Sequence, residues 1–357
     1  MAAACATYTP SELDTKRFWD IEASRQKTKV EIPYGFPAKL ESSLAWKGED
    51  IDVENEQAEW KLDLTDEEIS AIDAALKTFE ALSASTFELP SEFSQRLRSL
   101  SDQLYEGVGF QIIHGLDPTK YNSKQQMIVY AGRGTVDVKG TGVLAHIVNV
   151  QAGNKLKATA PAFSNIPLSF HTDNCEIMAF FYLDTAIEGV LHTLTEPWVL
   201  DTFKPLDLQP PRHCRLLQQT GCPKIPVLFR FSRYPITGWQ RQRNAALSIP
   251  TTAQHETADA IQFIAMKNAI TLPVAKGDML FVNDLALFHA RTGFKDDDIP
   301  MKRHLVKMYF RDPEQGWDIP EEMENEWRTS YKKEEGMEEV WNVLYKAGIE
   351  ELSMLNG

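Results

Sequence analysis

The sequence has few cysteines and no long apolar run. Its cysteines, Cys5, Cys175, Cys214 and Cys222, form no C-x-x-C pair. In a chain of 357 residues this spacing indicates reduced thiols and not a disulfide framework. No stretch approaches the roughly 18 apolar residues that cross a bilayer, and the first residues lack the basic and apolar regions of a secretory signal. We therefore predict a cytoplasmic protein that does not bind a membrane.

Positive charge is also scarce. Lysine and arginine number 37 against 51 aspartates and glutamates, for a net charge of −14. Nucleic acid binding needs clustered cations to neutralise phosphates, so nucleic acid is excluded as the main partner. The 43% hydrophobic and 25% charged residues are ordinary for a globular chain and exclude wholesale disorder. We expect a small-molecule substrate; the sequence does not indicate an oligomeric state.

Helical patterns dominate the first third of the chain and strand patterns the rest. Residues 9–63 are polar and irregular, and we expect an extended arm anchored by Trp19, Trp46 and Trp60. Thr65 and Glu68 form a capping box that begins a helix. Helical spacing also predicts helices at 90–106, 121–131 and 252–268. Apolar or alternating runs predict strands at 107–116, 177–183, 192–203, 226–233, 270–274, 279–282 and 304–310.

The number and length of these strands favour a mainly β fold with flanking helices (α+β) and a double-stranded β-helix, or jelly-roll, core. We predict one domain over residues 1–357, with the arm and first helices at 1–106, the core at 107–313 and a C-terminal helical segment at 314–357. The core includes a helical insert at 252–268. Residues 132–165 are glycine-rich and aperiodic, and we expect a lid loop there because long loops in compact domains are usually functional.

Residues 167–173 carry the strongest chemical signal, a His-x-Asp triplet. Side chains two apart on an extended segment point the same way, so His171 and Asp173 offer adjacent metal ligands. A histidine from far along the chain would complete a 2-His-1-carboxylate triad, which leaves metal positions open. His289, after the strand at 279–282, is the candidate. Core histidines and a turn aspartate are the alternative reading of these residues.

Arg303, at the start of the strand at 304–310, is expected on the inner wall of a closed roll near this metal. A buried arginine needs an anion, and its planar guanidinium matches a carboxylate with two hydrogen bonds. Open metal positions beside a carboxylate receptor fit a chelating keto acid with a second carboxylate, such as 2-oxoglutarate. The alternative is a surface ion pair between Arg303 and the acidic run at 296–298.

Several motifs in order resemble the taurine dioxygenase/TfdA-like branch of iron(II)- and 2-oxoglutarate-dependent oxygenases, with clavaminate synthase-like folds as relatives. They are the segments at 109–116, 171–173, 277–283, 289–291, 303–305 and 311–313. The amino-acid sequence of residues 231–233 and 277–291 is most similar to that of fungal members. The resemblance covers roughly residues 107–313.

The resemblance assigns roles residue by residue. His171, Asp173 and His289 match the iron ligands, and Arg303 matches the arginine that grips the distal carboxylate of 2-oxoglutarate. The family also uses a threonine for that carboxylate, for which Thr193 is our choice and Thr195 the alternative.

Family members often carry a second arginine four residues beyond the first, near the keto acid or the substrate. This chain has Lys307 at that position, which keeps the charge and loses the planar fork. With Arg230, Arg233 and Arg311, Lys307 is a candidate partner for an anionic substrate.

The resemblance therefore implies iron(II), 2-oxoglutarate and O2 as cofactor and cosubstrates, and oxidation of an unactivated C–H bond in a small acid or amino acid. Hydroxylation, desaturation and ring closure stay open, and a role in fungal specialised metabolism follows by resemblance alone. One alternative is a cupin-like isomerase or hydrolase with zinc or manganese. The other is a catalytically silent binding module.

Overall fold

The structure is a computed structural model. It describes residues 12–25, 42–55, 57–79, 87–131, 144–148, 161–173, 175–182, 188–189, 197–200, 212–215, 217–219, 227–237, 244–294, 303–321, 323, 331 and 344.

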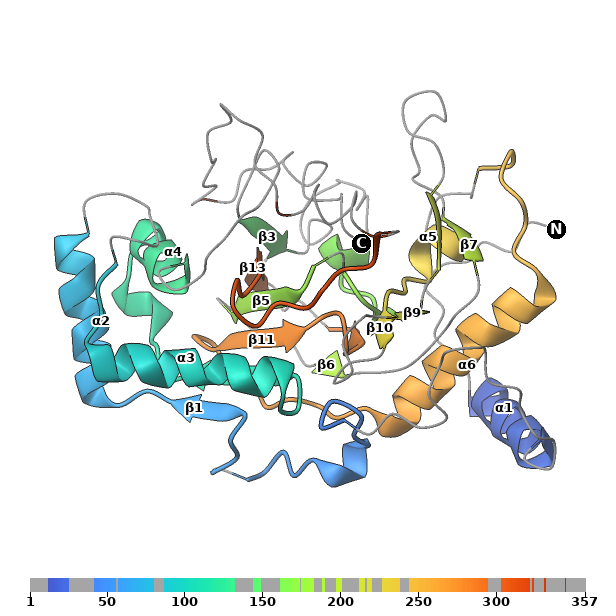
Figure 1. The fold of residues 1–357 in the computed structure, drawn as a ribbon, viewed down its shortest axis with the longest axis horizontal. Coiled ribbons are helices and arrows are strands. Elements are labelled where there is room, and N and C mark those ends of the chain that lie inside the picture. Colours follow the sequence, from blue (N-terminus) through green and yellow to red (C-terminus); the bar gives the residue numbers. More distant parts are fainter. Residues whose placement is uncertain are drawn as a thin grey trace.

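A six-stranded sheet forms the centre of the described part, in the order β1-β2-β11-β5-β13-β3. β1 runs parallel to β2, and every other neighbouring pair is antiparallel. The strands are β1 (Lys61–Asp63), β2 (Phe110–His114), β3 (Ala145–Val148), β5 (Ile177–Tyr182), β11 (Met279–Asn283) and β13 (His304–Phe310). Strands adjacent in space are thus drawn from distant parts of the chain (Figure 1).

A second sheet has three strands in the order β4-β12-β6, and two further pairs are β7-β8 and β9-β10. Their bounds are β4 (Leu168–His171), β6 (Glu188–Gly189), β7 (Pro197–Leu200), β8 (Arg212–Arg215), β9 (Leu217–Gln219), β10 (Val227–Phe229) and β12 (His289–Arg291). The predicted α+β class, with strands flanked by helices, is confirmed.

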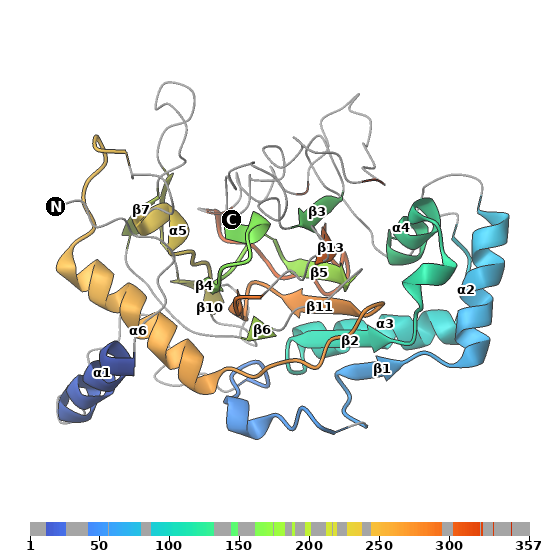
Figure 2. The same ribbon diagram turned by 180° about the vertical axis from the view of Figure 1, so that it is seen from behind.

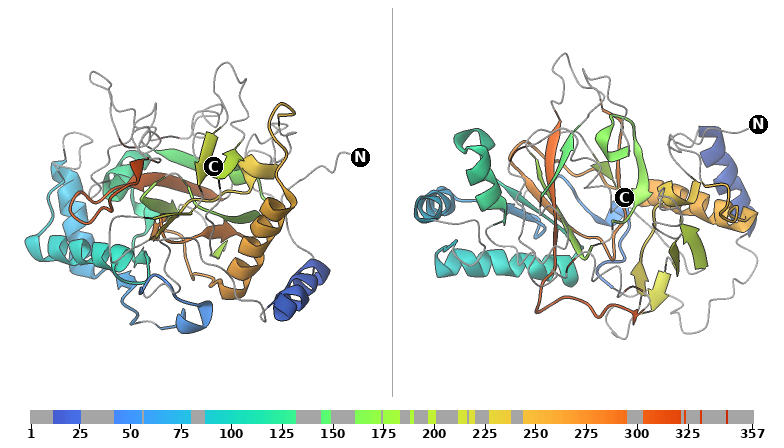
Figure 3. Two further views of the ribbon diagram at one scale, coloured as in Figure 1. Left: turned by 45° about the vertical axis from the view of Figure 1, so that its right-hand side comes forward. Right: turned by 90° about the horizontal axis from the view of Figure 1, so that it is seen from above.

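The helices gather at the two ends of the molecule. At one end lie α2 (Asp66–Thr78), α3 (Ser91–Tyr105) and α4 (Ser123–Ala131); at the other lie α1 (Glu12–Arg25), the short α5 (Tyr234–Thr237) and α6 (Thr252–Asn268). Figure 2, from behind, and the two views of Figure 3 show the same separation. Short 3-10 turns occupy Gly48–Asp50, Pro118–Lys120 and Pro161–Phe163.

Local sequence chemistry explains where two of these helices begin. Thr65 accepts a hydrogen bond from the Glu68 amide while Glu68 reaches back to the Thr65 amide, as the capping box predicts. Thr251 and Gln254 form an equivalent pair at the start of α6. Such caps each stabilise a helix by about 1 kcal/mol.

The strand register separates the two faces of the main sheet. Lys307 lies opposite Phe180, and Phe180 lies opposite Leu280, so these three side chains share one face. Phe281 belongs to the opposite face, which α3 covers. A hydrogen bond joins β11 to α3, since the side-chain amide of Asn283 donates to the Leu104 carbonyl at 2.9 Å. The face that carries Lys307 is therefore turned away from α3.

Three expectations about local structure need correction. Part of the expected N-terminal arm is the helix α1, whose Phe18 ring stacks on Phe263 of α6 at 4.8 Å. Residues 132–165 are not loop throughout, because β3 lies among them and completes an edge of the main sheet beside β13. Residues 270–274 form no strand and connect α6 to β11. In each case a tertiary contact, or its absence, overrides the local pattern.

The expected tryptophan anchors are confirmed. Trp60 is buried against Phe110, with ring centroids 5.3 Å apart. The Trp46 indole donates to the Val108 carbonyl at 2.8 Å. The Lys267 ammonium lies over the Trp19 ring, 4.5 Å from its centroid. Most of the expected C-terminal segment, 314–357, lies outside the described residues. None of the helices in the described ranges combines the length and the apolar run needed to cross a bilayer.

Candidate metal centre

Two histidines lie side by side on neighbouring strands of the second sheet. β12 pairs antiparallel with β4, and His289 is the direct partner of His171. The register shifts between His289 and Arg291, so the ladder is irregular next to the histidine pair. The two imidazole centroids lie 4.2 Å apart. Strand pairing thus brings together two histidines that are distant in sequence.

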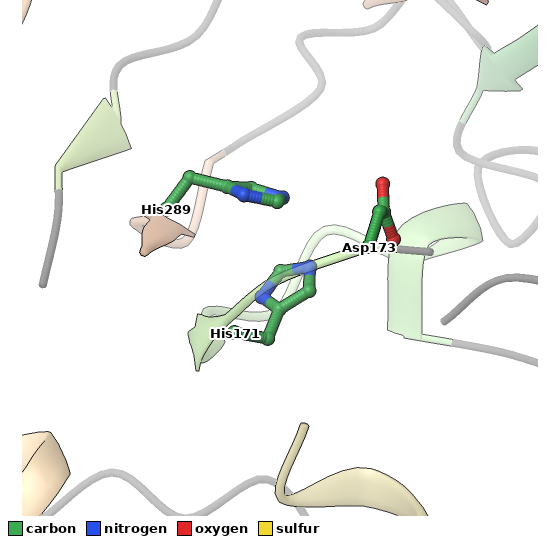
Figure 4. Close-up of side chains that lie close together, drawn as sticks. All are labelled: His171, Asp173 and His289. Atoms are coloured by element: carbon green, nitrogen blue, oxygen red, sulfur yellow. The ribbon is translucent and has the colours of Figure 1, made fainter. Parts of the chain in front are cut away.

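Asp173 completes the cluster from the segment that follows β4. One ligand atom from each of His171, Asp173 and His289 lies within 4.8 Å of the other two. Figure 4 shows His289 entering from β12 toward the other two side chains. Asp173 and His289 are buried and His171 is partly buried. The convergence expected from the sequence is what the structure shows.

The groups beside each Nδ1 atom indicate which imidazole nitrogens face the cluster. His171 Nδ1 lies 2.8 Å from the Ser169 carbonyl oxygen, and His289 Nδ1 lies 3.0 Å from Oδ1 of Asp284. When Nδ1 donates a proton to such an acceptor, Nε2 keeps its lone pair for a metal. Both histidines are therefore oriented as Nε2 ligands.

Asp284 connects two members of the cluster. Its Oδ2 accepts a hydrogen bond from the Asp173 amide, while Oδ1 faces His289. The side chain is fully buried, and the Cys175 thiol donates to the same Oδ2 at 3.6 Å. Burial, and then the nearby Asp173 carboxylate, raise the pKa of Asp284 well above its usual value.

Lys307 reaches the cluster from β13. Its Nζ donates to Asp173 Oδ2 at 2.9 Å. Burial by itself raises the pKa of Asp173, but Lys307 and the two imidazoles outweigh it, so the pKa is lowered. The carboxylate is thus kept ionised in a buried place.

His171 is kept neutral. Burial, and then the neighbouring His289, lower the pKa of His171 to about 4. A metal ligand must be an unprotonated imidazole, so the folded chain presents the form that binds metal. Two nitrogens and one carboxylate oxygen are a donor set suited to non-haem iron(II).

Arg303 is buried one residue before β13, in step with Lys307 along the strand. Its guanidinium lies 5.2 Å from the Phe294 ring, and that of Arg291 lies 5.0 Å from the same ring. Arg291 donates to the Ser164 and Ile166 carbonyls at 2.8 and 2.6 Å, so it fastens the chain before β4. Of the two arginines, Arg303 is the one that lies in step with Lys307 at the start of β13.

The other residues expected to bind 2-oxoglutarate or the substrate lie outside the described residues or have partners within the chain. Thr193 and Thr195 lie outside the described residues. Arg233 is buried and pairs with Asp259 of α6 at 2.8 Å, and Arg311 Nε lies 3.3 Å from Glu176 Oε2. Arg230 is buried just after β10. The structure thus couples Arg233 and Arg311 to carboxylates of the chain itself.

Two further histidines have partners outside the cluster. His114 Nδ1 lies 2.7 Å from Asp278 Oδ1, and His304 Nε2 lies 2.8 Å from His146 Nδ1. His255 lies in the first turns of α6. His192 and the side chain of His213 lie outside the described residues.

Sequence reasoning missed Asp284 and the Lys307–Asp173 contact. Asp284 reads as a strand breaker after β11, five residues before His289, and only the chain reversal between them brings the carboxylate onto the imidazole. The sequence did carry one signal for Asp284: an acidic residue that follows a buried strand and precedes a predicted metal ligand by five positions. Lys307 was assigned to the substrate because nothing in the sequence shows which side chain its ammonium meets.

The fold is that of non-haem iron oxygenases of known structure. An asparagine oxygenase solved with Fe(II), 2S,3S-3-hydroxyasparagine and succinate matches with a TM-score of 0.51 at 14% identity, over 72% of this chain and 98% of that one. The oxygenase OrfP, solved with Fe and alpha-ketoglutaric acid, matches with a TM-score of 0.50 at 15% identity, over 70% and 93%. These likenesses establish the fold alone.

The sequence itself is 29% identical over 329 residues to the taurine hydroxylase-like protein SAT17 of Stachybotrys chartarum (strain CBS 109288 / IBT 7711), covering 79% of this chain and 82% of that protein. No family model matches the chain. The resemblance to taurine dioxygenase-like oxygenases that the motifs predict is therefore confirmed by a relative.

Proposed function

We propose that this chain is an iron(II)- and 2-oxoglutarate-dependent oxygenase that oxidises an unactivated C–H bond of a small acid or amino acid. The observation that carries the proposal is the meeting of His171, Asp173 and His289 within 4.8 Å. The chain is also similar to a taurine hydroxylase-like protein and shares its fold with iron oxygenases.

The donor set fits the metal. His171 and His289 present Nε2 atoms, and Asp173 is an ionised carboxylate beside them. This 2-His-1-carboxylate arrangement suits iron(II) and leaves positions for further ligands. Iron and 2-oxoglutarate, when bound with O2, supply the oxidising power for the C–H bond. The task of the protein is to hold and orient the reactants and to exclude water.

Arg303 is the residue that we assign to the distal carboxylate of 2-oxoglutarate, with Thr193 as its partner. Arg303 is buried, and a buried guanidinium is stabilised by a carboxylate that it can bind with two hydrogen bonds. Arg230 and Arg233 are the candidates for an anionic group of the substrate.

The two sheets together make the double-stranded β-helix core that we propose for a single oxygenase domain. Lys307 of the main sheet meets Asp173, which follows β4 of the second sheet. The metal cluster thus lies between one face of the main sheet and the strands β4 and β12. An enclosed position of this kind limits the access of water to the reacting atoms.

The substrate class follows from relatives by analogy. A mutant of OrfP is solved with (3S)-hydroxy-L-Arg, and the asparagine oxygenase with 3-hydroxyasparagine. The relative SAT17 is named for taurine, a small sulfonate. A small molecule with an anionic group suits all three, and specialised metabolism in the cytoplasm of a fungus is the setting that we propose.

An anaerobic titration tests the proposal. Iron(II) and 2-oxoglutarate added together should produce a weak visible charge-transfer band in the wild type. The band should vanish in Asp173→Ala and persist in Asp278→Asn, since that carboxylate pairs with His114 away from the cluster. Exposure to O2 with a substrate should then yield succinate. Metal binding without the band and without succinate would favour a cupin-like hydrolase or isomerase, and failure to bind iron would favour a silent binding module.

A further inference from the structure

Lys307 contacts a proposed metal ligand directly. Its ammonium lies 2.9 Å from Oδ2 of Asp173. The side chains are only 12% and 3% exposed, so the pair is largely removed from water. A hydrogen bond between two charged groups is shorter and stronger than a neutral one, and burial strengthens it further. The contact is therefore a firm constraint on where the carboxylate points.

The main sheet fixes Lys307 in this position. β13 is flanked on both sides, so Lys307 pairs with Phe180 of β5 and with Ala145 of β3. The Tyr309 ring, two residues along the same strand, lies 5.2 Å from the Lys307 ammonium. The backbone of Lys307 is thus held in an interior strand, and its side chain extends along the Tyr309 ring toward Asp173.

The carboxylate of Asp173 is constrained from two directions. Its own backbone amide donates to Asp284, which sets the path of the chain, and Oδ2 accepts from Lys307. Oδ1 is then the oxygen that remains for a metal. A carboxylate with both oxygens available can bind a metal through either one or both, so the cation on Oδ2 favours binding through one oxygen.

We propose that Lys307 is a positioning residue, which holds Oδ2 of Asp173 so that the carboxylate takes a single metal position and leaves the others for the keto acid and O2. The inference rests on the proposed oxygenase function. The sequence pattern assigns Lys307 to the substrate, whereas its ammonium contacts the proposed metal ligand Asp173. A substrate carboxylate then has to find its cation elsewhere, and Arg230 and Arg233 are the candidates for that role.

The two roles for Lys307 predict different results. A positioning residue alters the metal site and keto acid binding when no substrate is present. A substrate anchor alters neither of them and raises only the KM of the substrate. Measurements without substrate therefore distinguish the two roles.

The experiment uses the full chain and compares Lys307→Met, Lys307→Gln and Lys307→Arg with wild type. Lys267→Met serves as the matched control, because that lysine lies on α6 over Trp19. Cobalt(II) replaces iron in one series, and its visible spectrum reports the number of ligands. In the other series 2-oxoglutarate is titrated anaerobically at saturating iron(II), with the charge-transfer band as the readout.

Loss of a side chain that orients a metal ligand typically costs about 10–100-fold in metal affinity or activity. We expect Lys307→Met to change the cobalt spectrum and to raise the apparent dissociation constant for 2-oxoglutarate about 10-fold or more. Lys307→Arg should recover most of the affinity since it keeps the charge and a donor. Lys307→Gln keeps only a neutral donor and should have an intermediate dissociation constant for 2-oxoglutarate. If the methionine variant does not fold, the glutamine variant takes its place in the test.

A wild-type cobalt spectrum and unchanged keto acid affinity in the folded methionine or glutamine variant, with a raised substrate KM, would overturn the positioning role. Failure of the wild type to bind iron and 2-oxoglutarate is a separate result, which removes the proposed function itself.

Discussion

Oδ1 of Asp284 lies 3.0 Å from Nδ1 of His289, while Oδ2 of the same carboxylate accepts from the backbone amide of Asp173. One buried side chain thereby lies against the ring of one proposed ligand and holds the backbone of another. The three residues come from two separate segments, so Asp284 joins the two halves of the site.

Replacing Asp284 by asparagine should weaken metal binding. Asparagine has one carboxamide oxygen in place of two carboxylate oxygens, so it can accept from the Asp173 amide or face His289 Nδ1, and not both. We expect a fall of about 10–100-fold in affinity for cobalt(II), measured by titration of the metal-free protein. Asp278→Asn is the matched control, because it alters a buried carboxylate that faces His114. Equal metal affinity in both variants would rule out this role of Asp284.

Replacing Arg303 by methionine should weaken 2-oxoglutarate binding and spare the metal. A hydrogen-bonded contact to a charged group contributes about 1.5–3 kcal/mol, which corresponds to roughly 10–150-fold in the dissociation constant. The charge-transfer titration measures this change, while cobalt(II) affinity should stay near the wild-type value. Arg98→Met is the control, since Arg98 pairs with Asp312 and Glu314. A proportional loss of metal affinity would indicate that Arg303 supports the fold and not the keto acid.

Glu176 should make the folded state less stable as the pH rises. Burial raises the pKa of this carboxyl to about 7, although Tyr105, Arg311 and Trp317 act in the opposite direction. Between about pH 4.5 and 7 the unfolded chain has released the proton and the folded chain retains it, so stability falls as the pH rises. The full effect is at most about 3 kcal/mol.

Chemical denaturation of the metal-free protein at about pH 5 and about pH 7.5, on either side of most of this transition, measures the difference for wild type and Glu176→Gln. The glutamine variant should lose this part of the pH dependence, since it cannot ionise. Identical pH dependence in the two proteins would contradict the raised pKa.

Gly277→Ala should destabilise the turn before β11. Gly277 has a φ of +98°, and a Cβ there would lie 1.9 Å from the Leu116 carbonyl oxygen. Backbone atoms cannot yield as a flexible side chain does, so we expect a loss of more than about 1 kcal/mol. Thermal denaturation measures the loss, with Ala275→Gly in the same turn as a comparison for backbone flexibility. A melting temperature equal to that of the wild type would show that the turn can rearrange.

Periodic and capping signals of the sequence were sufficient for the helices and strands longer than four residues that follow residue 65. The helix expected at 252–268 is α6 at the same residues, and the capping box at Thr65 begins α2. These signals are local, because a cap or an amphipathic face depends on residues within a few turns. β3 was not expected because a short edge strand among glycines has little pattern of its own and forms only by pairing with β13. The helix α1 was likewise hidden, since its packing on α6 stabilises it more than its own polar sequence does.

The sequence by itself determined which residues were available as ligands: a His-x-Asp triplet on one face, a distant histidine and a family resemblance that ordered them. Only the tertiary structure decided that His171 and His289 are register partners, that Asp284 lies against one of them, and that the Lys307 ammonium contacts Asp173. The physical reason is that side-chain alternation along a strand is a local property, whereas the pairing of strands and the partner of a buried charge depend on how distant segments pack.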